Sequence, residues 1–155
     1  MKYTKEELLS SDIDWFFIIN EAYIHVASAG GMIPEQINDI SILKKIQRKV
    51  YNLPFIFEEQ EIIFNENLLY ERFGNKTNSS QRTNYLRSFI EMSRKGFISI
   101  DRTNLSDSED NTYHIVCMPK KNKPIIGLEE LFRIKHSIDV YNKPIGNIDL
   151  LSLFG

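Results

Sequence analysis

The segment from His25 to Gly31 is the stretch of this chain whose residue types best suit the binding of a small ligand. Small residues after an apolar stretch let the backbone approach another group closely. If the segment led into a helix, its amide groups could hold a phosphate or a carboxylate. The spacing of a dinucleotide-binding glycine motif and the lysine of a P-loop are both absent. We predict a site at His25, Ser28, Gly30 and Gly31 as one interpretation, and a plain turn after a hairpin as the simpler one.

The single cysteine, Cys117, could in principle act as a nucleophile with a histidine as its base. Strict alternation along residues 113–118 would place His114 and Cys117 on opposite faces of a strand. We therefore predict that Cys117 packs as a small hydrophobic residue and that the chain has no catalytic residue. The dispersed cysteine and histidines also lack metal-ligand spacing, so we expect neither a metal nor a cofactor.

Several acidic residues could do chemistry but have simpler interpretations. Asp12 and Asp14, two residues apart, resemble the pair with which glycosyl-transferring enzymes hold a metal, although acids before a strand commonly form turns. Residues 107–110 resemble a calcium loop without its glycine and distal glutamate. In Asp101-Arg102, alternation puts the two side chains on opposite faces, so one of them points inward and requires a partner.

The elements that must position these residues follow from the hydrophobic patterning. Two β-hairpins are predicted, at about 15–28 around an Asn20-Glu21 turn and at about 97–118. A further strand is expected at 61–64, and helices at 5–9, 38–51, 65–73, 79–95 and 126–134. The predicted fold class is α+β, an antiparallel sheet built from the two hairpins with four or five helices packed against it. The predicted core consists of Trp15, Phe17, Ile24, Val26, Leu43, Ile46, Leu86, Phe89, Ile90, Ile98, Ile100, Ile115 and Leu131.

The chain as a whole suits one domain. Its 155 residues predict a single domain over 1–155, with a loosely patterned C-terminal tail at about 137–155. Apolar residues make up 42%, charged residues 26%, and the net charge is −2. One cysteine fits a reducing compartment, and no apolar run approaches the roughly 20 residues that span a bilayer. We expect a cytoplasmic protein without a signal peptide and without membrane contact.

A helix, Gly96 and a hairpin follow one another in the order of a winged helix-turn-helix domain. In that interpretation Gln81, Asn84, Arg87 and Arg94 would face nucleic acid. However, the proposed wing tip at 105–111 carries three carboxylates and no basic residue, and phosphates would repel it. Nucleic-acid binding is therefore the alternative, and a helix beside an ordinary hairpin is the favoured interpretation.

Two sequence blocks carry a resemblance. DIDWFF followed by IHVASAGG, and RKGFISIDRTN, resemble a family of small uncharacterised bacterial proteins over most of the first 120 residues. The resemblance implies a bacterial, single-domain, cytoplasmic protein and brings no activity or site residue with it. Because catalytic patterns are missing and aromatic residues favour interfaces as well as cores, the leading prediction is a non-catalytic module that binds an unknown protein partner.

Overall fold

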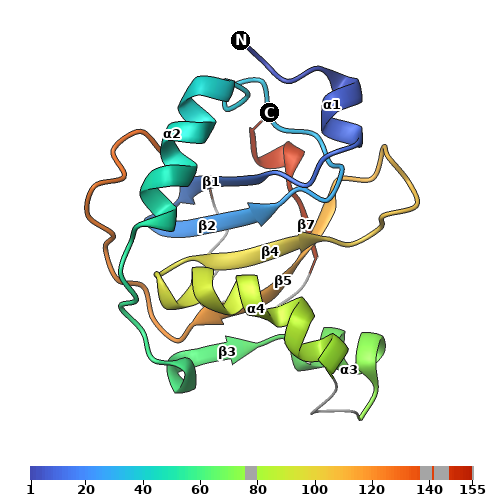
Figure 1. Ribbon diagram of the computed structural model, residues 1–155, viewed down its shortest axis with the longest axis vertical. Coiled ribbons are helices and arrows are strands. Elements are labelled where there is room, and N and C mark those ends of the chain that lie inside the picture. The colour runs from blue at the N-terminus through green and yellow to red at the C-terminus, as the bar shows by residue number, and fades with distance from the viewer. Residues whose placement is uncertain (76–79, 137–140, 142–146, 155) are drawn as a thin grey trace.

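A mixed β-sheet lies at the centre of the protein. The computed structural model describes residues 1–75, 80–136, 141 and 147–154, and over these residues the sheet has seven strands (Figure 1). The strand order is β3-β5-β4-β2-β1-β6, and β7 pairs with β5. The strands are β1 (Asp14–Ile19), β2 (Ala22–Ala27), β3 (Ile62–Phe64), β4 (Ile98–Arg102), β5 (Thr112–Pro119), β6 (Phe132–Ile134) and β7 (Asn147–Asp149).

The α+β class and both predicted hairpins are confirmed, but the prediction of an antiparallel sheet is wrong. β2 pairs in parallel with β4, and β1 pairs in parallel with β6. The two hairpins join through β2 and β4, and the long connection between these strands carries three helices. Such a crossover brings the chain back to the same end of the sheet, which makes the pair parallel. The alternation of apolar residues determines the face of the sheet on which a side chain lies, but it does not determine which strands pair with each other.

The turn of the first hairpin has the backbone that its sequence predicts. Asn20 and Glu21 both have positive φ angles, 47° and 68°. Two such residues in a row make a type I′ turn, whose twist matches that of the flanking strands. Ile19 is therefore paired with Ala22, and this register places Trp15, Phe17 and Ile24 on one face of the sheet.

Four α-helices are present in the described ranges, and polar side chains cap the N-termini of the first three. The helices are α1 (Lys5–Leu9), α2 (Ile40–Tyr51), α3 (Glu66–Phe73) and α4 (Ser80–Arg94). The side chains of Thr4, Asp39 and Asn65 accept backbone N–H groups in the first turns of α1, α2 and α3. After α4, Gly96 has a φ of +112°, which a glycine adopts without strain. Two 3₁₀ turns, Glu59–Glu61 and Leu151–Phe154, complete the elements.

The helix predicted at 126–134 is wrong. Gly127 has a φ of +93°, and the chain then forms β6 along the outer edge of β1, with Phe17 paired to Phe132. Leu128 and Leu131 lie in the loop before β6, and their side chains are buried in the core. The predicted tail is partly outside the described residues, and within it Asn147–Asp149 forms β7 on β5.

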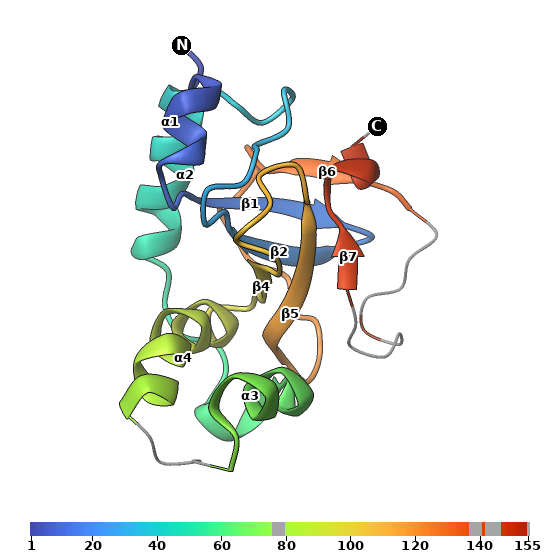
Figure 2. The ribbon, with the colours of Figure 1, turned by 90° about the vertical axis from the view of Figure 1, so that its right-hand side faces the viewer.

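The helices α2, α3 and α4 cover one face of the sheet, and β7 with the last 3₁₀ turn lies on the other side (Figure 2). Every residue of the predicted core is buried except Ile90, which is half-buried and packs against the hydrophobic cluster that contains Leu86 and Phe89. Among the described residues, no helix is long and apolar enough to cross a membrane.

Candidate functional site

The loop after β2 uses its own backbone amides within the chain. Each N–H group from Ser28 to Gly31 donates to a group of the same protein, so none of the four is left to hold an anion. The acceptors, in order, are Ile13 O, Asp12 Oδ1, Ser11 O and Ser28 O. The Ser28 hydroxyl is also buried and accepts the Ile13 N–H at 2.7 Å. This geometry does not favour the predicted ligand site at His25, Ser28, Gly30 and Gly31.

The close backbone approach that the small residues indicated is made to the protein itself. A Cβ on Gly31 would lie 2.4 Å from the Tyr113 hydroxyl oxygen and 3.1 Å from Arg102 Cδ. The first distance is shorter than a real Cβ contact reaches and the second is tight, so any side chain here would require its neighbours to shift. Gly30 has a φ of +82°, which again suits glycine. The two glycines therefore have a structural explanation that requires no ligand.

Arg102 ties this loop to the hairpin that joins β4 and β5. Its side chain is 3% exposed and donates to the carbonyl oxygens of Ala29 at 3.0 Å, Asp110 at 3.2 Å and Asp107. The acidic tip at 105–111 is therefore folded around a buried cation. β4 and β5 are neighbours within the sheet rather than a separate two-stranded wing.

Asp101 points to the opposite face, beneath α4, where it is also buried. It accepts a hydrogen bond from the Tyr85 hydroxyl at 2.8 Å and lies 3.7 Å from Arg72 Nη1. Burial raises the pKa of Asp101, although Tyr85 and Arg72 oppose the shift, and burial also raises the pKa of Tyr85. His114 lies 3.5 Å from the same hydroxyl, and burial lowers its pKa to about 4. Both Asp101 and Arg102 thus point inward, each with its own partners.

The predicted separation of His114 and Cys117 is wrong. The pairing of β4 with β5 shifts between Ser99 and Ile100, and this bulge puts both side chains on the face that α4 covers. Cys117 is fully buried, with its Sγ 3.3 Å from the Ser93 hydroxyl. Burial raises the pKa of its thiol to about 12, so the thiolate that nucleophilic chemistry requires is not formed near neutral pH.

A serine, a histidine and an aspartate meet below α4. His25 Nε2 is 2.8 Å from Asp14 Oδ1, and His25 Nδ1 is 3.0 Å from the Ser99 hydroxyl. These are the residue types of a hydrolytic triad. However, Ser99 has no exposed surface, and its hydroxyl is also within 3.3 Å of the Phe89 carbonyl. No substrate can reach this serine, so the arrangement cannot carry out acyl transfer.

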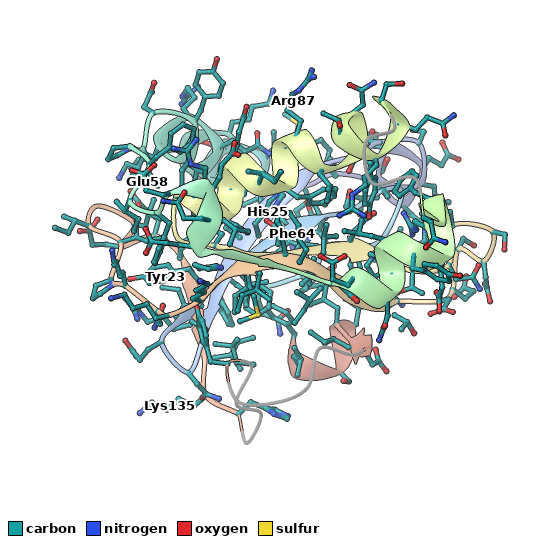
Figure 3. All side chains as sticks on the ribbon, turned by 90° about the horizontal axis from the view of Figure 1, so that it is seen from below. Tyr23, His25, Glu58, Phe64, Arg87 and Lys135 are labelled. Carbon is teal, nitrogen blue, oxygen red and sulfur yellow. The ribbon has the colours of Figure 1, made fainter. Side chains whose placement is uncertain are left out.

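Only the aspartate of this group reaches solvent, and it does so in a cleft between α2 and α4. The Asp14 side chain is 53% exposed, whereas that of His25 is buried. The cleft has a volume of about 360 Å³. Figure 3 shows His25 on the sheet below α4, with Arg87 on the opposite, outer side of that helix. The cleft is lined by Tyr3, Asp12, Ile13, Asp14, Phe16, Gln47, Val50, Tyr51 and Met92.

The predicted nucleic-acid residues lie along α4 but do not form a free cationic surface. Gln81, Asn84 and Arg87 are exposed, and Arg87 donates to Asn84 at 3.4 Å. Arg94 instead holds the segment before β3, since it donates to the Phe57 carbonyl and lies over the Phe55 ring at 4.1 Å. Its role is structural, and the geometry lends nucleic-acid binding no support.

Sequence reasoning singled out Asp12 and Asp14 as a pair but missed the cleft around them. The walls of the cleft come from the N-terminus, α2 and α4, and local sequence patterns do not predict that these segments lie together. Among the described residues no group of acidic, histidine or cysteine side chains could hold a metal, so the cleft is not a metal site of that kind. No protein-family model, curated protein or solved structure matches the chain, and the resemblance to small bacterial proteins therefore stays a prediction.

Proposed function

We propose that this protein is a non-catalytic protein-binding module, and that the cleft between α2 and α4 is its binding surface. The proposal rests on one observation. The groups of the Ser99–His25–Asp14 network that could react are buried, whereas the carboxylate at its other end is exposed in a cleft. His25 and Ser99 are at most 1% exposed, whereas Asp14 lies in the cleft lining. Such a site can recognise a partner but offers no reachable nucleophile.

The rim of the cleft has the composition of an interface. Tyr51, which lines the cleft, is 80% exposed at the C-terminal end of α2. Tyrosine and phenylalanine are enriched in protein interfaces, where a few buried aromatic anchors supply most of the binding energy. At about 360 Å³ the cleft lies near the lower end of the range for small-molecule sites, which suits one large side chain from a partner.

A photo-cross-linking experiment tests the proposal. A photoreactive phenylalanine analogue replaces Tyr51, and a matched variant carries it at Tyr70, a tyrosine on α3 that is 61% exposed. Both variants are expressed in cells of the native host and irradiated. We expect one discrete cross-linked protein from position 51 and none from position 70. No discrete product from position 51, or the same product from both positions, would contradict the proposal.

A further inference from the structure

We propose that the cleft holds an arginine side chain of the partner protein, with the carboxylates of Asp12 and Asp14 as its acceptors. This inference rests on the proposed function and names the chemistry of the same site. Both aspartates are exposed and line the cleft, one on each side of the buried Ile13. The bound group must therefore be one that can pair with two carboxylates and pack against aromatic side chains.

The polar groups of the cleft are mainly acceptors. One N–H of the Gln47 amide donates to the Asp14 backbone carbonyl at 2.8 Å, which leaves the second N–H and the amide oxygen of Gln47. Asp12 and Asp14 add carboxylate oxygens, which only accept. A guanidinium group is purely a donor, with five N–H groups in a fixed fork. An acceptor-rich cleft and a donor-only side chain are complementary.

The charge of the two carboxylates is not neutralised by lysine or arginine. Over the described ranges, neither aspartate forms a salt bridge with a lysine or an arginine, and the Asp14 carboxylate is hydrogen-bonded to His25. Glu130 shows the contrast, because both Lys45 and Lys49 lie within salt-bridge distance of it. Negative charge left unpaired in a concave site attracts a cation from outside.

The apolar lining favours arginine over lysine. Tyr3, Phe16, Tyr51 and Met92 line the cleft, and Tyr51, at 80% exposed, offers a ring face on which a planar group can stack. A guanidinium stacks on aromatic faces and is weakly hydrated, whereas an ammonium is a compact, strongly hydrated charge. Lys95 Nζ lies 5.7 Å from the Tyr51 ring but is held by the Val50 and Tyr51 carbonyls and does not line the cleft.

His25 prepares one of the two carboxylates for this role. It is 1% exposed, stacks on Phe16 with ring centroids 5.4 Å apart, and holds Asp14 Oδ1 at 2.8 Å. The carboxylate is therefore oriented before any ligand arrives. Preorganisation of this kind improves affinity because less conformational freedom is lost on binding.

The test uses the full chain and a capped Gly-Arg-Gly peptide, followed by the backbone amide signals of Asp14, Gln47 and Tyr51 in nuclear magnetic resonance spectra. The same peptide with citrulline, an uncharged isostere of arginine, and with lysine serves for comparison. Asp12→Asn and Asp14→Asn remove charge, and the asparagine at 14 retains an oxygen that can accept from His25. Glu71→Gln is the matched control, since Glu71 is an exposed carboxylate on α3.

We expect saturable shifts with the arginine peptide, weaker binding of lysine and no binding of citrulline. Each asparagine variant should weaken arginine binding by about tenfold or more, the effect of one hydrogen bond to a charged group, and Glu71→Gln should not. Equal binding of citrulline, or no saturable shift with arginine, overturns the inference. If position 51 still cross-links a partner with the same yield in the Asp12→Asn and Asp14→Asn backgrounds, the inference fails while the proposed function stands.

Discussion

Replacing Arg102 by methionine should destabilise the protein strongly, although this residue lies outside the cleft. The side chain is 3% exposed and donates to three backbone carbonyls, two of them in the hairpin loop and one in the loop after β2. Methionine fills a similar volume but donates no hydrogen bond. All three carbonyls would then lose the partner that the buried guanidinium supplies.

The size of the effect follows from two opposing contributions. A hydrogen bond to a charged group contributes about 1.5–3 kcal/mol, so three bonds set an upper limit of roughly 4.5–9 kcal/mol. Removing the buried cation also removes the cost of its desolvation, which is several kcal/mol. The difference predicts that Arg102→Met lowers the free energy of unfolding by about 2–4 kcal/mol. The free energy of unfolding of Arg102→Lys should lie between those of the native protein and Arg102→Met, because one ammonium group cannot replace a guanidinium that reaches three carbonyls.

Urea denaturation at neutral pH measures this change, and Arg87→Met is the matched control. Arg87 is exposed and makes a single hydrogen bond of 3.4 Å to Asn84, so its replacement should alter the free energy of unfolding by no more than about 0.5 kcal/mol. Amide hydrogen exchange in residues 103–111 should accelerate in Arg102→Met well before global unfolding. If both variants unfold at the same urea concentration, the argument that Arg102 organises the two loops is refuted.

Three further perturbations test other parts of the structure. Gly31→Ala should lower the free energy of unfolding by about 1–3 kcal/mol through overpacking. Adding Tyr113→Phe should recover part of that loss, because it removes the oxygen 2.4 Å from the new Cβ. Strictly additive effects of the two substitutions in urea denaturation would contradict this. The pKa of His114 is lowered to about 4, so between its usual 6.5 and 4 the unfolded chain binds a proton that the folded chain does not. The stability of the native protein relative to His114→Gln should therefore fall as pH drops from 7 to 4, and a constant difference across urea titrations would contradict it. Cys117 should react with a thiol reagent at pH 8 only after unfolding, and rapid labelling of the folded protein would show that the thiol is accessible.

The parts of the fold that were predictable are those set by neighbours in sequence. The Asn20-Glu21 turn and the glycine after α4 each depend on a few adjacent residues, and each has the expected geometry. The parallel pairing of β2 with β4 depends on where a long crossover returns, which no local pattern encodes. The segment at 126–134 failed because helical spacing over nine residues also fits a turn followed by an edge strand.

The candidate site shows the same division. Alternation correctly placed Asp101 and Arg102 on opposite faces, yet it failed one strand away, where a bulge moves Cys117 to the side of His114. A bulge adds one residue to one strand, and the sequence of β5 contains no glycine that would indicate it. Asp12 and Asp14 were noticed as a pair, but the other side of the cleft is lined by residues distant in sequence, such as Tyr51, about 40 positions away, and Met92.

The position of a polar group in the fold, rather than its type, decides what it can do here. Ser99, His25 and Asp14 are joined by hydrogen bonds of 3.0 and 2.8 Å, but exposure increases along the series from a buried hydroxyl to a half-exposed carboxylate. A hydrolase needs the opposite order, with the nucleophile in the open and the aspartate buried behind the histidine. In this protein the serine and histidine form the support, and the aspartate faces the cleft. A chain of hydrogen bonds with that direction can fix a recognition carboxylate, and this is the physical basis for expecting binding without turnover.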